Sequence, residues 1–491
     1  MFEKITPESA GISTRSILDF IKKLEKRGAS MHGILFMKGD KIFTEAYWKP
    51  FNKDFCHRMY SQTKSFVGIA IGLLQDEGKL SINDKIIDYF PEKVDGEVLH
   101  YHKELTIKDM LTMSTAGDSS PYWFFIEDKD RTHAYFNGNR PLHPSGTIWE
   151  YDSTGSQVLC SLVEKLAGKS LLAYMKEKLF DKMGVFGTAT VLKTRHEDSW
   201  GDSAMICTLR DIAAFGRLLM NNGVWNGESL ISEQYVKEAT SKIANKAYAP
   251  HYSAYHLGYG YQIWRVSGNG FAFNGMGCQF AHCYPDSDFM VVFNSDTQCS
   301  VGMASTLLHY GVLNMKRALT DNLEENANDY AKLKTALNDF SLHNGYGEKS
   351  SPIIAEIENK TFTLGENNMQ IKWVKFNFNG DEGVMTYENP RGIKQIKFGL
   401  EKYVFFEFPE THYYHTRVHT PKGSGYVCTA SGAFTMPNRL LIRVNAVDVN
   451  LGHIGINAEF KNGEISMFFT KVAEGFFDEY KGYATSVTAK K

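Results

Sequence analysis

The period of the hydrophobic residues changes along this chain, and these changes limit the folds that it can adopt. From residue 13 to 27, the apolar side chains fall on one helical face. Residues 33–48 alternate instead around Lys38-Gly39-Asp40, which predicts a β-hairpin. Helical patterns return between residues 61 and 221, and strand-like runs begin again at about residue 258.

Three strand-like runs, GYGYQIW, FAFNGMGCQFAHCY and FMVVFNSDT, precede a helix expected at about 302–318. A turn signal, Pro285-Asp286-Ser287-Asp288, separates the last two runs. Strands that are joined by tight turns pair antiparallel. We therefore predict an α+β fold, in which an antiparallel sheet is flanked by helices and carries a helical subdomain.

The C-terminal part of the chain follows a strand pattern throughout. From Ser351 onwards, alternating runs such as QIKWVKFNF, YVFFEF and LLIRVNAV recur without helical periodicity, which predicts an all-β domain. The preceding segment is polar and acidic and predicts a short helix and linker. The predicted organisation is a domain over 1–320, a helix and linker over 321–350, and an all-β domain over 351–491.

The composition excludes several classes of protein. Of the 491 residues, 43% are hydrophobic and 22% are charged, as in ordinary folded proteins. The formal net charge is −2, so bulk charge favours neither nucleic acid nor an anionic membrane as a partner. No apolar run approaches the roughly 18 residues of a spanning helix, and we expect no membrane association.

The N-terminus and the cysteines predict a cytoplasmic protein. The segment MFEKITPESAGIST has no basic region, no apolar run and no small-residue cleavage site. The seven cysteines include no close C-x-x-C pair, so we expect buried, reduced thiols. We expect no metal and no cofactor. The sequence leaves homo-oligomerisation open.

The first group with catalytic potential is Ser61-Gln62-Thr63-Lys64, at the start of a predicted helix. At positions i and i+3, the hydroxyl and the amine lie on one face. A serine needs a base to take its proton, and burial and the helix dipole both favour the neutral lysine that could act as this base. The first helical turn also offers the backbone N–H of Ser61 to an oxyanion. Alone, S-x-x-K is a weak motif.

Two further groups follow in the chain. Tyr151-Asp152-Ser153 precedes a helix, and a phenol beside a lysine can relay a proton to a leaving group. The run from Phe273 to Gln279 carries glycines within a strand pattern, which indicates close approach of another backbone or a ligand. An edge strand beside the Ser61 helix could supply a second oxyanion N–H. Each group alone also fits a structural role, in packing or in a bulge.

In this order, the three groups resemble those of the β-lactamase-related serine hydrolases. That superfamily includes class C β-lactamases, penicillin-binding D,D-peptidases, family VIII carboxylesterases, D-aminopeptidases and the nylon-oligomer hydrolase. The similarity covers most of residues 30–318, including RMYSQTKSFVGIAIGLLQDEGKL and TLRDIAAFGRLLMNNGVWNGESLIS. It implies a β-lactamase/transpeptidase-like fold. The phrase SGAFTMPNRLLIRVNAV resembles the lipocalin-like barrel of relatives, for which we expect a structural role.

The resemblance implies a role for each group. Ser61 corresponds to the acylated nucleophile and Lys64 to its base. Tyr151 corresponds to the tyrosine of the Y-x-N/S motif, and Ser153 to its third position.

The strand motif is where the sequence departs from its relatives, which carry K-T-G or H-x-G. Alignment with Phe273-Asn274-Gly275 makes the Met276 N–H the second oxyanion donor, and a shift of two residues would give Cys278 instead. Either way, the cation that helps relatives to hold a substrate carboxylate is missing. The G-x-G-x-Q pattern is more similar to the nylon-hydrolase and esterase branches.

Aromatic segments suggest the chemistry of the pocket. Tyr122, Trp123 and Gln279 are candidate pocket residues, and aromatic walls with few charges suit an apolar substrate. We therefore predict a serine hydrolase that cleaves an ester or amide of a small apolar or aromatic-bearing molecule through an acyl-Ser61 intermediate. The alternatives are an acyltransferase with the same acyl-enzyme, a β-lactamase or D-aminopeptidase, and, last, a non-catalytic binding protein.

Overall fold

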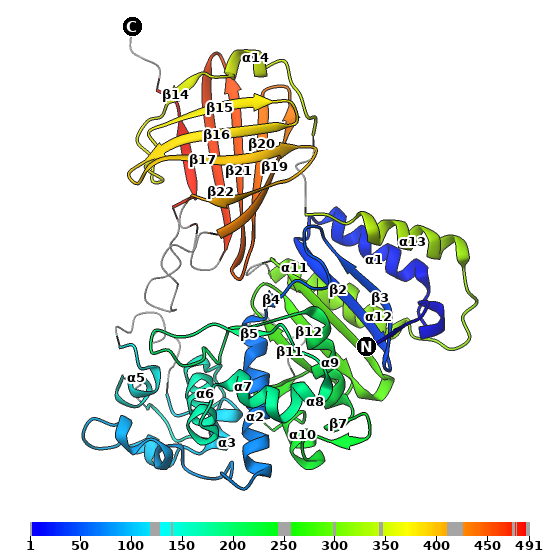
Figure 1. Ribbon diagram of the computed structural model, residues 1–491, viewed down its shortest axis with the longest axis vertical. Coiled ribbons are helices and arrows are strands. Elements are labelled where there is room, and N and C mark those ends of the chain that lie inside the picture. The colour runs from blue at the N-terminus through cyan, green and yellow to red at the C-terminus, as the bar shows by residue number, and fades with distance from the viewer. Residues whose placement is uncertain are drawn as a thin grey trace.

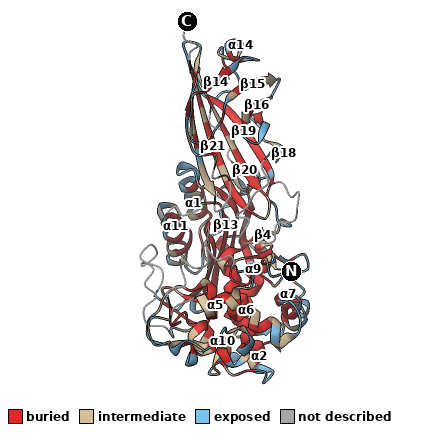
Figure 2. Ribbon diagram, turned by 90° about the vertical axis from the view of Figure 1, so that its left-hand side faces the viewer, coloured by how far each residue is buried: buried red, intermediate tan, exposed pale blue. Residues whose placement is uncertain are grey.

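The computed structural model describes residues 2–117, 128–138, 141–243, 257–297, 301–342, 347–409, 426–473, 477 and 479–487. Two large β-sheets dominate these residues, with helices gathered around the first sheet (Figure 1). Buried residues run through the strands of both sheets and through the helices beside the first (Figure 2). Among the described helices, none is both long enough and apolar enough to cross a membrane.

The first sheet has eight strands in the order β1-β3-β2-β13-β12-β11-β10-β9. Only the short β1 pairs in parallel, with β3, so the predicted antiparallel sheet is confirmed. The strands are β1 (Glu3–Lys4), β2 (Met31–Lys38), β3 (Lys41–Tyr47), β9 (Gly258–Tyr259), β10 (Trp264–Arg265), β11 (Phe271–Gly275), β12 (Gln279–Tyr284) and β13 (Phe289–Ser295).

Two expectations about the strand that carries Gly275 were wrong. The run FAFNGMGCQFAHCY is not one strand but two, because the chain turns at residues 276–278 between β11 and β12. Gly277 and Cys278 have φ values of 80° and 65°, which lie in the left-handed region, and this backbone conformation turns the chain. Since β10 and β9 pair beyond β11, the strand that carries Gly275 lies inside the sheet rather than at its edge.

The helices cover both faces of the first sheet. Alternate residues of β2 divide between two cores: Ile34 and Phe36 pack in one, and Leu35 and Met37 in the other. This is the period of two expected for a strand buried on both sides. The described helices are α1 (Thr14–Lys26), α2 (Thr63–Asp76), α3 (Ile107–Leu111), α5 (Arg131–Gly138), α6 (Ser153–Ala167), α7 (Leu171–Met175), α8 (Asp181–Met183), α9 (Leu209–Met220), α10 (Glu233–Ala239), α11 (Val301–Thr306), α12 (Asn314–Arg317), α13 (Ala327–Asp339) and α14 (Ile354–Ile357).

Side-chain caps explain where several helices begin. Ser13 caps α1, and Thr106 and Asp109 form a capping box at α3. The helix predicted from Ser61 begins as a 3₁₀ turn, η2 (Tyr60–Gln62), and becomes α-helical at Thr63. Three short strands, β4 (His57–Arg58), β5 (Thr190–Val191) and β6 (Met205–Cys207), pair beside it, and β7 (Val224–Trp225) pairs with β8 (Glu228–Ser229).

The C-terminal sheet confirms the predicted all-β domain. Its strands are β14 (Thr361–Thr363), β15 (Trp373–Asn379), β16 (Glu382–Asn389), β17 (Gly392–Leu400), β18 (Val404–Phe408), β19 (Tyr426–Met436), β20 (Arg439–Val447), β21 (Leu451–Lys461), β22 (Glu464–Ala473) and β23 (Gly482–Thr485). A bridge between Leu364 and Ser486 joins the ends of the two outer strands, so the sheet curls around its own core. The boundaries at residues 320 and 350 stay predictions.

Where the two sheets meet, the core of each takes in residues from the other part of the chain. Val447 and Leu451, at the ends of β20 and β21, are buried in a core of the first sheet. Trp200 and Ala204, from the segment before β6, pack in the core of the C-terminal sheet. The β20–β21 turn is therefore packed into the helix-flanked part of the molecule.

Candidate active site

Ser61 lies in a tightly fixed turn. The preceding residue, Tyr60, is fully buried and has a φ of 48°, which is rare for a residue with a side chain. The Thr63 hydroxyl donates to the Tyr60 carbonyl at 2.6 Å and accepts from the Met205 N–H at 3.0 Å. Backbone conformations of this kind persist where their surroundings enforce them, and they cluster at functional sites.

Lys64 approaches Ser61 as the sequence predicts. Its Nζ donates to Ser61 Oγ at 3.0 Å and to the Asp202 carbonyl oxygen at 2.8 Å. The Asp202 carboxylate lies 3.8 Å from the same Nζ. The lysine side chain is 1% exposed, whereas Ser61 is only half-buried. A base within hydrogen-bond distance of a reachable hydroxyl is the geometry needed for proton abstraction.

Tyr151 is the third predicted catalytic residue, and it lies beside the lysine. Lys64 Nζ is 5.1 Å from the centroid of its ring. Trp264 stacks on this ring at 5.7 Å and 11°, and Trp149 lies 6.5 Å from it between ring centroids. Asp152 holds this segment because its Oδ1 caps α6 at Gly155 N, 2.8 Å away, and Ser153 is the first residue of that helix.

Strand β11 passes directly against the nucleophile turn. A Cβ on Gly275 would lie 2.2 Å from the Met59 carbonyl oxygen, so only glycine allows this approach. The Gln62 side-chain amide donates to the Phe273 carbonyl at 3.4 Å. Met276 follows Gly275 directly, beside the backbone that leads to Ser61.

Gln279 and Asn274 differ in how deeply their side chains are buried. The Gln279 side chain, a predicted pocket residue, is fully buried and donates to the carbonyl oxygens of Met276 at 3.0 Å and Ser295 at 2.7 Å. These hydrogen bonds fix the turn that follows β11. Asn274 is half-buried and pairs across the sheet with Phe280.

The first position of the strand motif carries no charge. Phe273 is buried, and its ring lies 5.2 Å from that of Phe215 in α9. The other predicted pocket residues, Tyr122 and Trp123, lie outside the described residues.

Two charged side chains near Lys64, the buried Asp202 and the half-buried Arg131, were missed by sequence reasoning. Asp202 is 2% exposed, and its Oδ1 lies 3.9 Å from Arg131 Nη1. The Arg131 guanidinium also lies 5.2 Å from the Trp200 ring centroid. The Asp202 carboxylate therefore lies between Lys64 Nζ and the Arg131 guanidinium. No local spacing in the sequence links these three residues.

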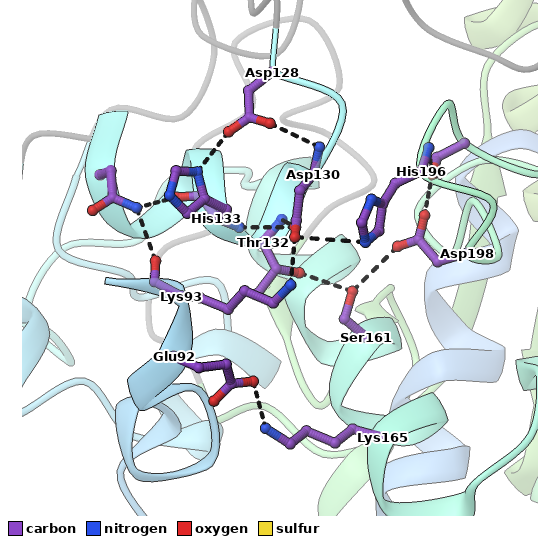
Figure 3. A network of polar contacts seen from close by, with 12 residues as sticks. Glu92, Lys93, Asp128, Asp130, Thr132, His133, Ser161, Lys165, His196 and Asp198 are labelled. Carbon is purple, nitrogen blue, oxygen red and sulfur yellow. Dashed lines mark hydrogen bonds and ion pairs between the residues drawn. The ribbon is translucent and has the colours of Figure 1, made fainter. Parts of the chain in front are cut away.

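A polar network holds the helix that begins with Arg131 (Figure 3). His133 Nδ1 lies 2.6 Å from Asp128 Oδ2, and its Nε2 lies 3.1 Å from Asp95 Oδ2. The hydrogen bonds with Asp128 and Asp95 raise the pKa of His133. Thr132 Oγ1 donates to Ser161 Oγ at 2.9 Å, which ties α5 to α6. Within the described part of the chain, no cluster of His, Cys, Asp and Glu is arranged to hold a metal ion.

Aromatic rings surround Tyr151. Trp264 also meets Trp149 at 5.7 Å and Tyr259 at 4.9 Å between ring centroids, and Trp149 meets Tyr259 at 5.8 Å. Burial raises the pKa of Tyr259. This side of the site is therefore apolar.

A family model described as Beta-lactamase matches residues 19–310, more than half of the chain. The chain belongs to the beta-lactamase family. Ser61, Lys64 and Tyr151 all lie within the matched part.

Proteins and solved structures that are similar to the chain include hydrolases. The 6-aminohexanoate-dimer hydrolase of Paenarthrobacter ureafaciens is 24% identical over 248 residues, which is 47% of this chain and 63% of that protein, so the match spans less than two thirds of that relative. A putative beta-lactamase from Bacteroides dorei has a TM-score of 0.52 at 15% identity, over 62% of this chain and 99% of that one. A family VIII carboxylesterase has a TM-score of 0.51 at 16% identity, over 62% and 97%. The two structures show the fold.

Proposed function

We propose that this protein is a serine hydrolase that cleaves an ester or amide through an acyl-Ser61 intermediate. The observation that carries the proposal is the 3.0 Å hydrogen bond from Lys64 Nζ to Ser61 Oγ. The turn around Ser61 is held by the Thr63 hydroxyl, which donates to the Tyr60 carbonyl and accepts from the Met205 N–H. Membership of a family of hydrolases supports the same reaction type.

Acylation begins at Ser61. Neutral Lys64 takes the hydroxyl proton as Oγ forms a bond to the substrate carbonyl carbon. Negative charge then develops on the carbonyl oxygen. The Ser61 N–H and the Met276 N–H are proposed to stabilise this charge, because Gly275 brings β11 against the turn that carries Ser61.

Expulsion of the leaving group requires a proton. We assign its delivery to Tyr151, whose ring lies 5.1 Å from Lys64 Nζ. The proton taken from Ser61 passes from Lys64 through the phenol to the leaving oxygen or nitrogen as the carbon–heteroatom bond breaks. Water then attacks the acyl-Ser61 ester in the reverse sense, which releases a carboxylic acid and restores Ser61.

The walls of the site favour an uncharged, apolar substrate. Trp264 stacks on Tyr151, the half-buried Trp149 contacts both rings, and the buried Tyr259 packs against Trp149 and Trp264. The first position of the strand motif is the buried Phe273, which has no charge to attract a substrate carboxylate. Esters or amides that carry an apolar or aromatic group are therefore proposed ahead of β-lactams.

The test compares the turnover of p-nitrophenyl esters, D-amino-acid amides and nitrocefin. We expect the esters or amides to turn over fastest, and Ser61→Ala to remove turnover. Ser65→Ala is the matched control: this serine lies one turn further along α2 and donates to the Gln262 carbonyl at 2.8 Å. Turnover that survives in Ser61→Ala would overturn the proposal, and fast turnover of nitrocefin alone would overturn the substrate class.

A further inference from the structure

The turn between β20 and β21 contacts a buried arginine next to the nucleophile turn. Asn450 lies in this turn and is 8% exposed. Its Oδ1 accepts a hydrogen bond from Arg58 Nη1 at 3.0 Å, although the two residues are 392 positions apart. In Figure 1 the orange hairpin of the C-terminal sheet extends down towards β4, the strand that contains Arg58.

Arg58 connects this hairpin to two other segments. Its side chain has no exposed surface, and its Nε donates to the Ser203 carbonyl oxygen at 3.0 Å. The guanidinium carbon lies 4.4 Å from the ring centroid of Tyr60 and 4.5 Å from that of Trp200. Cation–π contacts of this kind strengthen when water is excluded.

The two segments that Arg58 contacts, at Tyr60 and at Ser203, each lie next to a residue of the proposed catalytic site. Tyr60 is the residue before Ser61. Ser203 is the residue after Asp202, whose carbonyl oxygen accepts from Lys64 Nζ at 2.8 Å. Arg58 therefore spans the turn that carries the nucleophile and the turn that holds its base.

The hairpin itself is fixed in place on both sides of Asn450. Val447 and Leu451 are buried in a core of the first sheet. Further along β21, His453 Nδ1 lies 2.8 Å from Asp296 Oδ2, and Asp296 directly follows β13. Asn450 therefore presents its amide oxygen to Arg58 from an anchored position.

We propose that Asn450 is a positioning residue for the acylation of Ser61, so that the C-terminal sheet contributes to the catalytic geometry. It acts through Arg58: the amide oxygen fixes the guanidinium, which holds the Ser203 carbonyl and, with it, the neighbouring Asp202 carbonyl that accepts from Lys64. A buried guanidinium N–H that loses its acceptor costs free energy, and this cost favours a shift of the side chain towards another acceptor. Such a shift would move both turns relative to each other. This inference rests on the proposed function of Ser61.

The test measures how fast a fluorophosphonate probe labels Ser61 in the full-length chain, over a range of probe concentrations. Asn450→Leu keeps the branched shape and the number of side-chain heavy atoms and removes the acceptor. We expect the limiting labelling rate to fall about tenfold, because small misplacements of catalytic groups cost rate. The probe concentration at half-saturation should change less than about twofold. Asn450→Asp keeps an acceptor for Arg58 and should label at close to the original rate.

Asp448→Ala is the matched control in the same turn. Asp448 accepts from Val427 N at 2.9 Å and from Val449 N at 2.6 Å, so its loss perturbs the turn without removing an acceptor of Arg58. It should label at the original rate. If Asn450→Leu does not fold, Asn450→Ala replaces it in the comparison with Asn450→Asp.

The outcomes separate the two hypotheses. An original chain that takes no label at Ser61 overturns the proposed function. If the original chain is labelled and folded Asn450→Leu or Asn450→Ala reacts equally fast, only the positioning role is overturned. Equal slowing of Asn450→Asp, or equal slowing of Asp448→Ala, would also overturn that role, because a general structural effect would then account for the loss.

Discussion

The α-carbon of Gly275 faces the carbonyl oxygen of Met59 so closely that a Cβ would lie 2.2 Å from that oxygen. Because the contact joins backbone to backbone, no flexible side chain could move aside to make room for a Cβ. This contact places β11 against the turn that carries Ser61, two residues after Met59.

Gly275→Ala should therefore separate the strand from the nucleophile turn. We expect a loss of about 1–3 kcal/mol of unfolding free energy from overpacking, and a fall of about 10²-fold in kcat/KM from misplaced groups. Thermal unfolding and ester hydrolysis measure the two effects. Gly187→Ala is the control, because a Cβ there meets nothing within 4 Å. Full activity in Gly275→Ala would contradict a role for this approach.

Tyr151→Phe removes the phenolic proton and keeps the ring that stacks on Trp264. Since general acid–base groups contribute about 10²–10⁴-fold, kcat should fall by that range while the melting temperature stays close to that of the original chain. Steady-state kinetics with an ester of a poor leaving group measure this best, because such a group needs the proton. A change in kcat below about threefold would remove Tyr151 from the mechanism.

Acid should destabilise the protein through His102. This ring is buried, stacks on Tyr135 at 5.5 Å, and has a pKa that burial lowers from 6.5 to about 4. As the pH falls below 6.5, the unfolded chain takes up a proton before the folded one does. The stability present above that pH is therefore lost progressively, by up to about 1.4 kcal/mol per pH unit.

His102→Phe keeps an aromatic ring and removes this titration. Chemical unfolding at about pH 7, 6 and 5 should show a shallower loss of unfolding free energy in the variant. Exposed His100→Gln serves as the control. The same slope in His102→Phe and the original chain would show that another group causes the acid sensitivity.

His133 should make the protein less stable as the pH rises, whereas His102 makes it less stable as the pH falls. Its pKa is raised, first by the hydrogen bond with Asp128, so the folded state holds the proton more tightly than the unfolded state does. Its stabilisation is complete below its ordinary value of 6.5 and is lost as the pH rises through the folded value. Going from about pH 6 to 8 should lower the melting temperature less in His133→Asn than in the original chain. An identical drop would exclude His133 as the source.

Local patterns predicted the parts of the site that depend on local geometry. The spacing of Ser61 and Lys64 follows from one helical turn, and the hairpin at Lys38-Gly39-Asp40 from its turn residues. The strand run around Gly277 was misjudged because the pattern of apolar residues continues through the turn, although the backbone there is left-handed.

Contacts between distant segments could not be predicted in this way. Asp202 meets Lys64 across 138 positions, and Asn450 meets Arg58 across 392. Such pairs are created by packing: Trp200 and Ala204 are buried in the core of the C-terminal sheet, whereas Met205, the next residue, is buried in a core of the first sheet. No periodicity or motif in a single sequence encodes that placement.

The most direct test of the proposed mechanism is to locate the acyl group itself. The chain is mixed with a slowly hydrolysed aryl ester, quenched in acid within the burst phase, digested and analysed by peptide mass spectrometry. We predict one added acyl group on the peptide that contains Ser61, formed at the rate of the burst and missing in Ser61→Ala. Rapid ester turnover with no acylated peptide, or an acyl group on another residue that Ser61→Ala leaves unchanged, would contradict the acyl-Ser61 mechanism.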